Sequence, residues 1–564
     1  MIQERLASLV REALETAAGA LDLSPPLPEV ELEKPKRREF GDFSTNVALA
    51  AASRIGANPR DVAGAIVAAL PPADFLEKAE IAGPGFINLH VTDDWLHEVL
   101  REVVALGDAY GHGERTGYSV QVEFVSANPT GPLHIGQARN AAIGDAISNV
   151  MEAAGWRVER EYYFNDAGRQ MDLFGSSVEA RYLELFGHAA EIPEDGYGGD
   201  YLVAVAKDIA AALGDSLVNL PEEERHTRLL HEGSERVLAM IKVTLERFGV
   251  AFDVYFSERT LHDNGEIDLA VKRLREAGHA FDQEGAVFFR STSFGDDKDR
   301  VLIRSNGAPT YFAADCAYLI DKFSRGFDRL VYVWGADHHG DVKRVKGAAQ
   351  ALGFDPDAVE MVLYQWVHLQ RGGQAVGMSK RAGTFVTLDE LIDEVGADAT
   401  LFTLLSHSND SSMTFDIDVV KQQSLENPVY YVQYGHARIA SILRHAKERG
   451  IELAPIGEAE LARLTAEAEL DLLRAIAELP GEVQEAAAGR SPYRLTHFAE
   501  RLASEFHRFY TECRVVTDDS VLTQARLWLS VAAKQAIGNT LALLGVSAPE
   551  SMERAEGDVS EESR

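Results

Sequence analysis

A strand that runs through a loop into a helix is the feature that most restricts how this chain folds. The segment "YSVQVEFV" at 118–125 alternates apolar and polar residues as a β-strand does. The loop "SANPTGPLHIG" follows, and Ile143, Ile147, Val150 and Ala154 then recur at helical spacing. Parallel strands need a crossover connection, which is usually a helix. The segment therefore predicts the first strand and helix of a parallel α/β sheet.

Three further apolar runs are typical of strands that are buried on both faces. They are "WRVEREYYF" at 156–164, "RLVYVWGAD" at 329–337 and "VEMVLYQWVHL" at 359–369. The long stretch between the first two of these runs is mostly of helical pattern. We therefore expect an insertion at about 170–290 that divides the sheet domain.

The rest of the chain predicts four more parts. Residues 1–112 mix helical periods with short apolar runs and indicate a small α/β domain ahead of a sheet domain at 113–400. A connector at 401–427 leads into 428–552, where Ala, Leu, Glu and Arg recur at helical spacing and predict an all-helical domain. Residues 553–564 are polar and acidic, and we expect a disordered tail there.

Composition limits the class of protein. The chain has 564 residues, of which 46% are hydrophobic and 26% charged, as in globular proteins of several domains. No long uncharged stretch predicts a membrane span. The two cysteines, Cys316 and Cys513, are too few for a disulfide framework, and we expect both in the core of a cytoplasmic protein.

The charge balance argues against broad nucleic-acid binding. A net charge of −34 does not suit a protein that coats nucleic acid through a basic surface. A local patch is still enough for a specific nucleic acid, and "KPKRR" at 34–38 is the densest basic run. The alternative is that this run is only a solvated loop.

The chain lacks the common ATP-binding loop but offers another way to hold phosphate. It contains no Gly-Lys pair, which excludes the P-loop. At the start of the predicted helix, backbone N–H groups, the close-approach residue Gly136 and the side chain of His134 could contact a nucleotide. Lys380 in "GMSKRAGTF" follows the last predicted strand, where its charge could reach a leaving pyrophosphate.

These motifs resemble those of a known family. H-I-G-Q at 134–137 and M-S-K-R at 378–381 are similar to the HIGH and KMSKS signatures of class I aminoacyl-tRNA synthetases, in the same order. "VEFVSANPTGPLHIG", "YYFNDAGRQ", "PTYFAADCAY", "WGADHHGD" and "NPVYYVQYGHARI" resemble blocks of the arginyl-tRNA synthetases, and "FGDFSTN" and "GFIN" resemble their N-terminal domain. The resemblance implies a Rossmann-like parallel-sheet catalytic domain with a helical insertion, a small N-terminal α/β domain at the tRNA elbow and an all-helical anticodon-binding domain.

The resemblance also implies a reaction and its partners. L-arginine attacks the α-phosphate of ATP, which binds with Mg²⁺, and the terminal adenosine of tRNA-Arg then accepts the arginyl group. In this interpretation His134 stabilises the phosphoryl transition state and Lys380 neutralises the pyrophosphate, so catalysis depends on positioning and charge. The family likeness implies a monomer, and since the sequence shows no cluster of metal ligands, we expect no protein-bound metal. The residues expected at the nucleotide are His134, Gly136, Gln137, Asp337, His338, Met378, Ser379 and Lys380.

An arginine-specific site needs a carboxylate for the guanidinium and often an aromatic face beside it. Tyr311 and Asp315 stand one helical turn apart and match family positions that hold the substrate, so we expect them at the guanidinium. Glu123 and Asn128 match positions nearer the α-amino group. The alternative is that the tyrosine is a core residue and each carboxylate is paired with a neighbouring cation.

Asp337, His338 and His339 follow a predicted strand, at the edge where open α/β sheets bind ligands. Adjacent histidines do not converge easily on a metal, so we favour nucleotide contact.

The residues expected to bind tRNA are less specific. By likeness, the head of the helical domain lies near the anticodon, where Tyr430, Tyr434, His436 and Arg438 could stack on or bond to bases. Packing in the core explains the two tyrosines equally well, because they share one helical face. In the basic run, the candidate phosphate contacts are Lys36, Arg37 and Arg38.

Three positions depart from the family pattern. Gln137 replaces the second His of HIGH, Gly377 replaces the first Lys of KMSKS, and Leu401 stands where Arg is expected. They keep open a non-catalytic tRNA-binding relative. A small-molecule nucleotidyltransferase with a HIGH-type turn is another alternative, although such chains are short and lack a helical tRNA-binding domain.

Overall fold

The computed structural model describes residues 2–35, 37–166, 168–377 and 386–552. The candidate residues Lys36, Met378, Ser379 and Lys380 and the expected tail at 553–564 lie outside these ranges.

Contacts divide the chain into two compact units. The first consists of Met1–Tyr110, Leu443–Pro480 and Glu505–Gln535, and the second of Gly111–Ile442, Gly481–Ser504 and Ala536–Arg564.

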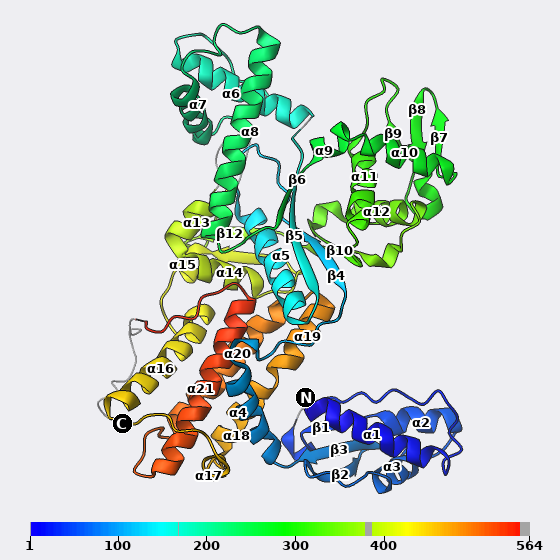
Figure 1. The fold of residues 1–564 in the computed structure, drawn as a ribbon, viewed down its shortest axis with the longest axis vertical. Helices are drawn as coiled ribbons and strands as arrows, with labels where there is room; N and C mark the ends of the chain where they lie inside the picture. The colour runs from blue at the N-terminus through cyan, green and yellow to red at the C-terminus, as the bar shows by residue number, and fades with distance from the viewer. Residues whose placement is uncertain (1, 36, 167, 378–385, 553–564) are drawn as a thin grey trace. The chain divides into compact units, whose positions relative to one another are not determined.

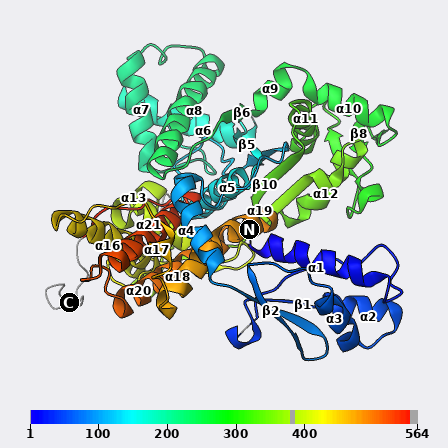
Figure 2. The same ribbon diagram turned by 60° about the horizontal axis from the view of Figure 1, so that its bottom comes forward.

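The N-terminal part of the first unit is a small α/β fold. Its strands are β1 (Phe43–Thr45), β2 (Leu76–Ala82) and β3 (Phe86–Val91), and they form an antiparallel sheet of order β1-β3-β2. Helices α1 (Ile2–Ala18), α2 (Val47–Ile55) and α3 (Pro59–Ala68) pack on one another and on this sheet (Figure 2). The short helix η1 (Arg38–Phe40) precedes β1.

Helices complete the first unit. Helix α4 (Asp94–Leu106) packs against α18 (Glu467–Ala477). The short helix η2 (Gly107–Ala109) follows α4 in the chain, and α17 (Glu458–Leu461) precedes α18. The Tyr110 hydroxyl donates to the carbonyl of Ile476 at 3.1 Å.

A five-stranded parallel sheet forms the centre of the second unit (Figure 1). Its order is β11-β10-β4-β5-β6, with bounds β4 Ser119–Glu123, β5 Arg157–Phe164, β6 Val254–Ser257, β10 Arg329–Gly335 and β11 Val359–Tyr364. Every residue of β4 is buried, and helix α5 (Ile135–Ala153) packs against the sheet. A Cβ at Gly144 would lie 2.1 Å from the ring of Phe124, so glycine lets the helix approach the strand.

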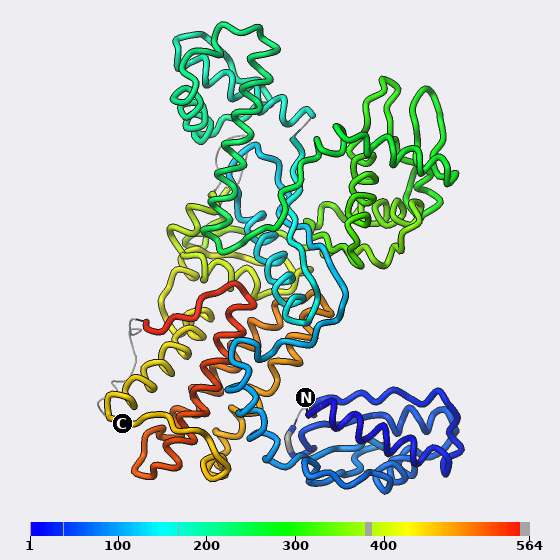
Figure 3. Tube along the Cα trace, in the orientation of Figure 1, coloured from blue at the N-terminus to red at the C-terminus, as the bar shows by residue number. Residues whose placement is uncertain are grey.

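The long stretch expected to be helical also returns to the sheet (Figure 3). After β5 the chain forms three helices, α6 (Arg169–Leu185), α7 (Asp200–Leu213) and α8 (Glu222–Arg247), and then strand β6, which the helical pattern did not predict. Beyond β6 lie α9 (Glu258–Asp263), α10 (Glu266–Glu276), the antiparallel strands β7 (Ala280–Gln283), β8 (Ala286–Phe289) and β9 (Arg300–Ile303) around η3 (Ser291–Phe294), α11 (Tyr311–Ser324), η4 (Ala336–His338), α12 (His339–Ala351) and η5 (Pro356–Ala358).

The predicted single strand at 359–369 is wrong. It is two strands of different sheets, β11 and β12 (Val367–Arg371), and β12 pairs with β13 (Gln374–Ala375) and β14 (Met413–Asp416). The buried Arg139 donates to the carbonyls of Gln365 and Ser411 at 2.7 and 2.9 Å, which fixes the break between the two strands. Along the chain, two helices lie between β13 and β14, namely α13 (Leu388–Val395) and α14 (Ala397–Leu405), and α15 (Ile417–Val420) follows β14.

The expected fold class is confirmed. The described residues from 428 to 552 contain only helices and their connections, namely α16 (Pro428–Glu448), α17, α18, α19 (Leu479–Gly489), α20 (Tyr493–Glu512) and α21 (Ser520–Leu543). Cys316 and Cys513 are buried, as expected, and Leu401 is a core residue of α14. Among the described helices, none has the length and apolarity that a membrane span requires.

Asn140 on α5 joins the two central strands to this helix. Its Oδ1 accepts the backbone N–H of Val125 at 2.7 Å, just after β4, and its Nδ2 donates to the carbonyl of Val333 on β10 at 2.9 Å. One buried amide thus satisfies two backbone groups at the end of the sheet where polar side chains converge.

We predict that Asn140→Ala lowers the free energy of unfolding by about 2 to 4 kcal/mol, because two buried backbone groups lose their partner. Urea denaturation would measure the loss. As a control, Asn264→Ala removes an exposed amide and should change stability by less than about 0.5 kcal/mol. Equal stability of the two variants would contradict this role of Asn140.

Candidate functional site

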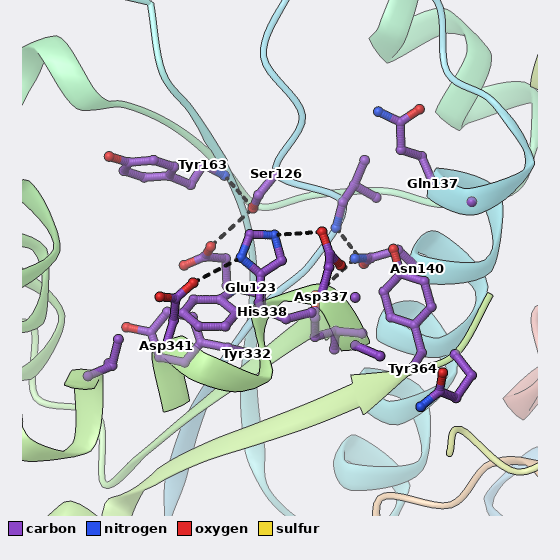
Figure 4. A pocket seen from close by; sticks show the side chains of 18 of the residues that line it. Glu123, Ser126, Gln137, Asn140, Tyr163, Tyr332, Asp337, His338, Asp341 and Tyr364 are labelled. Carbon is purple, nitrogen blue, oxygen red and sulfur yellow. Dashed lines mark hydrogen bonds and ion pairs between the residues drawn. The ribbon is translucent and has the colours of Figure 1, made fainter. Parts of the chain in front are cut away.

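A cavity of about 870 Å³ opens at the carboxyl ends of β4 and β10. The N-terminus of α5, the first turns of α11 and the segment between β11 and β12 complete its walls. Figure 4 shows Glu123, Ser126 and Tyr163 toward one end of the cavity and Gln137, Asn140 and Tyr364 toward the other. Open parallel sheets bind ligands at this edge.

The start of α5 is built as a capped helix terminus. His134 is the N-cap residue, and its Nδ1 accepts the N–H of Gly136 at 3.1 Å. A Cβ at Gly136 would lie 3.1 Å from the His134 ring, which explains why a small residue suits this turn. The remaining N–H groups and the helix dipole favour an anion here.

Gln137 has a structural role that the sequence did not reveal. Its Oε1 accepts the backbone N–H of His134 at 2.9 Å, which completes a capping box. Within the described residues its Nε2 has no hydrogen bond and remains available as a donor. The amide therefore serves the helix with one atom and offers the other to a ligand.

The described residues just after the "MSKR" signature lie against the loop that contains His134. Thr387 forms an isolated antiparallel bridge with His134, and the N–H of Leu388 donates to the carbonyl of Leu133 at 2.8 Å. The first described residues that follow "MSKR" thus lie beside the first signature.

One stripe of α11 carries four polar or charged side chains toward the cavity and the sheet. Tyr311, Asp315, Tyr318 and Lys322 recur every three or four residues, so they share a face of the helix. Tyr311, Asp315 and Tyr318 line the cavity, whereas Lys322 is completely buried beneath it. Only Tyr311 and Asp315 of this stripe are predicted from the sequence.

Asp315 is a partly buried carboxylate for which the described residues provide no hydrogen bond or ion pair. Burial, together with the nearby carboxylates of Glu258 and Glu123, raises the pKa of Asp315 to about 7. A cationic ligand group at Asp315 would relieve this repulsion and favour the ionised carboxylate.

Glu258 is a further carboxylate at this end that the sequence analysis missed. It is buried at the start of α9, and its Oε2 accepts the Tyr163 hydroxyl at 2.5 Å. Burial raises the pKa of Glu258, which Tyr163 and His262 partly offset. Its segment, "YFSE" at 255–258, spans the end of β6 and the first residue of α9, and it gave no signal because the strand itself was not predicted.

Glu123 lines the cavity but already has a cation. Its Oε2 accepts Lys322 Nζ at 2.5 Å, and its Oε1 accepts the Ser126 hydroxyl at 3.2 Å. Glu123 is therefore a buried carboxylate paired with a neighbouring cation, as the alternative interpretation of the sequence expected. It also lines the cavity, so the ion pair does not prevent contact with a ligand.

The nucleotide candidates Asp337 and His338 lie together on η4, directly after β10. Asp337 and His338 line the cavity, and His338 contacts Asp341 at 3.3 Å between Nδ1 and Oδ2 (Figure 4). Trp366, which the sequence analysis did not select, also lines the cavity and is 61% exposed. An exposed tryptophan ring at this position offers a flat apolar surface to a base.

Asn128 is not among the residues that line the cavity. Its Oδ1 accepts the N–H of Asn165 at 3.2 Å and its Nδ2 donates to Gln170 at 2.9 Å. It fixes the loop after β4 against the start of α6. His339, the first residue of α12, is exposed and also lies outside the lining.

The aromatic candidates at the head of α16 are packed. Tyr430 and Tyr434 are 7% exposed and stack with ring centroids 6.0 Å apart. Arg438 lies over the Tyr434 ring at 4.9 Å, and His436, 5% exposed, contacts the Pro549 carbonyl at 2.9 Å. This geometry favours the interpretation of Tyr430 and Tyr434 as core residues, and His436 is buried as well.

In the first unit, Lys34 pairs with Glu478, and the exposed Arg37 contacts Glu39 at 3.2 Å. Arg38 begins η1. The described residues contain no group of three or more His, Cys, Asp or Glu side chains arranged to hold a metal ion.

Comparisons with known proteins agree along the chain. Residues 4–91 match the family "Arginyl tRNA synthetase N terminal domain", residues 100–416 match "tRNA synthetases class I (R), catalytic domain", and residues 432–552 match "DALR anticodon binding domain".

Similar whole proteins carry the same description. The "Arginine--tRNA ligase" of Carboxydothermus hydrogenoformans is 47% identical over 97% of this chain and 98% of its own length. That of Moorella thermoacetica is 50% identical over 98% of this chain and 99% of its own. The solved arginyl-tRNA synthetase of Thermus thermophilus has the same fold, with a TM-score of 0.78, 22% identity and coverage of 98% and 100% of the two chains.

Proposed function

Because the chain belongs to the arginyl-tRNA synthetase family, and is an enzyme that ligates arginine to tRNA, we propose how its cavity holds the substrates. The carboxylate-rich end that contains Asp315 binds L-arginine. The N-terminus of α5 and the ends of β10 and β11 bind ATP.

The unpaired Asp315 carries the proposal for arginine. A planar guanidinium needs an ionised acceptor, and Asp315 is a cavity carboxylate that forms no ion pair within the described residues, although Arg344 acts on it as a more distant positive charge. Tyr311, 55% exposed one turn away, can cover the guanidinium plane. Glu258, held by Tyr163, adds negative charge behind Asp315.

The capped helix terminus supports the proposal for ATP. His134 and the free N–H groups of α5 would contact phosphate oxygens, and the Gln137 Nε2 adds a neutral donor. Asp337 and His338 would face the nucleotide from η4, directly after β10. Mg²⁺ would enter with the ATP phosphates, where it neutralises charge, and Lys380 would act on the pyrophosphate.

The remaining partners follow from the family. The acceptor is tRNA-Arg, and we propose that the chain acts as a monomer in the cytoplasm. Arginylation of a tRNA-Arg transcript with labelled arginine tests the whole assignment. Absence of arginyl-tRNA would contradict the assignment of the substrates to this cavity.

We predict that arginine binding weakens as the pH falls through 7. The Asp315 carboxyl, with its pKa raised to about 7, is mostly ionised at pH 8 and mostly protonated at pH 6, while the guanidinium stays charged. The KM for arginine should therefore rise about tenfold from pH 8 to pH 6.

Substitution isolates this carboxylate from other groups that titrate. Asp315→Asn should raise the arginine KM at least tenfold, since a charged hydrogen bond contributes about 1.5 to 3 kcal/mol, and should flatten the pH dependence. Asp268→Asn, at an exposed position of α10, should keep the wild-type profile. A pH dependence that persists in Asp315→Asn would remove Asp315 from the pocket.

We predict different roles for the two polar residues of the first signature. His134→Ala should lower kcat by about 10² or more, as loss of a transition-state donor does. Gln137→Ala should lower kcat less than about tenfold and cost about 0.5 to 2 kcal/mol of stability through the lost cap. His134→Asn keeps an N-cap acceptor, so it should fold normally and still be slow. Normal activity of His134→Asn would show that His134 only caps the helix.

A further inference from the structure

The loop between β4 and α5, which leads to His134, needs support from outside itself. Residues 124–133 form neither helix nor strand. Val125 and Ser126 have φ values of 63° and 41°, a left-handed conformation that side chains other than glycine rarely adopt. Such a conformation persists only where the surrounding structure imposes it. The contacts of this loop therefore bear on the position of His134.

The helical insertion between β5 and β6 contacts the loop directly. In the first turn of α7, the Tyr201 hydroxyl donates to the carbonyl of Thr130 at 2.6 Å. A Cβ at Gly131 would lie 3.2 Å from the Tyr201 ring, so glycine lets the ring cover the loop. Burial raises the pKa of Tyr201, so the hydroxyl keeps its proton at neutral pH. In α6, Gln170 accepts the Asn128 side chain at 2.9 Å.

The insertion also supports the end of the loop indirectly, through α13. The N–H of Leu388, the first residue of α13, donates to the carbonyl of Leu133 at 2.8 Å. The C-terminal end of α8 packs against this part of α13 (Figure 1). There the buried Thr244 donates its hydroxyl to Asp389 of α13 at 2.5 Å. The start of α13 thus lies between the insertion and the residue before His134.

Arg247, the last residue of α8, adds charge to this contact. Its guanidinium binds Asp389 and also Asp393, one turn further along α13. A single exposed ion pair contributes little to stability. Here one cation holds two carboxylates, and one of these also accepts the Thr244 hydroxyl. The set of contacts therefore fixes where α13 begins relative to α8.

We propose that the helical insertion supports the first signature, and that Tyr201 and Arg247 are positioning residues that hold the loop before His134 in place for the reaction of ATP. The proposal rests on the ATP site proposed above. Neither residue lines the cavity, so each acts through the backbone that it holds. A displacement of about 1 Å at a reacting group can lower a rate about a hundredfold, so loss of one support should slow the step that uses His134.

Tyr201→Phe tests the direct contact, because it removes the hydroxyl and keeps the ring over Gly131. We expect the single-turnover rate of pyrophosphate formation, with saturating ATP, arginine and tRNA-Arg, to fall about three- to tenfold, as for loss of one hydrogen bond. The KM for arginine should stay within about twofold of wild type. The control Tyr182→Phe removes a similar bond inside the insertion, from the Tyr182 hydroxyl to the Gly214 carbonyl at 2.5 Å, and should change the rate less than about twofold.

The two tyrosine variants separate positioning from stability. Each loses one hydrogen bond from a tyrosine to a backbone carbonyl, so the Tm should fall by a similar amount in both. Only Tyr201→Phe should slow pyrophosphate formation. Equal rates in Tyr201→Phe and Tyr182→Phe would show that the Tyr201 bond is only structural and would overturn the proposal.

Arg247→Met tests the indirect contact. It should lower the same rate about two- to fivefold, while Arg247→Lys, which keeps a cation, should stay closer to the wild-type rate. The control Arg236→Met breaks an ion pair with Glu232 on the same helix, 2.7 Å long, and should leave the rate unchanged. A wild-type rate in Arg247→Met would remove α8 and α13 from the support of the loop.

His134→Ala separates this proposal from the ATP site itself. A normal rate of pyrophosphate formation in His134→Ala would refute the ATP site and, with it, the role of the insertion. A slow His134→Ala together with wild-type rates in Tyr201→Phe and Arg247→Met would refute the role of the insertion alone.

Discussion

Two buried carboxylates that lie side by side on the parallel sheet, one of which also lines the cavity, determine which charges must pack against the sheet. Glu123 and Glu161 are neighbours in register on β4 and β5, away from water. Burying two like charges is expensive, and removing one partner from a buried pair typically costs about 3 to 5 kcal/mol. Lys322 of α11 and Arg325, the residue that follows this helix, supply the compensating positive charges. These ion pairs help to hold the C-terminal end of α11 on the sheet. The earlier turns of the same helix then place Tyr311, Asp315 and Tyr318 at the cavity.

Helix α5 connects the other parts of the site through polar side chains that bind backbone groups. Asn140 joins the ends of β4 and β10, and Arg139 holds the carbonyls where β11 ends and β12 begins. His134 and Gln137 close the N-terminus of the same helix. Most residues of α5 are buried. The polar side chains of Asn140 and Arg139 on this helix connect the strands and loops of the domain through hydrogen bonds to their backbone groups.

The sequence predicted much of this arrangement, and the misses have physical reasons. Family motifs located Asp315 and His134, and apolar runs located most strands. Strand β6 was missed because four residues between helices leave no periodicity to detect. Lys322 was missed although it continues the stripe of Tyr311 and Asp315, since a lysine normally indicates a solvent-facing position. The double use of the Gln137 amide also depends on geometry that residue type does not encode.

The break between β11 and β12 places a tryptophan in the cavity wall whose fluorescence depends on its exposure to water. It exposes Trp366, while the other four tryptophans of the chain, Trp95, Trp156, Trp334 and Trp528, are buried or half-buried. Its backbone is fixed because the Trp366 carbonyl accepts the N–H of Met413 at 3.1 Å. A water-exposed indole emits at longer wavelength than a covered one, so the intrinsic fluorescence of this protein should report, without an added label, whether the end of the cavity at which we propose that ATP binds is occupied.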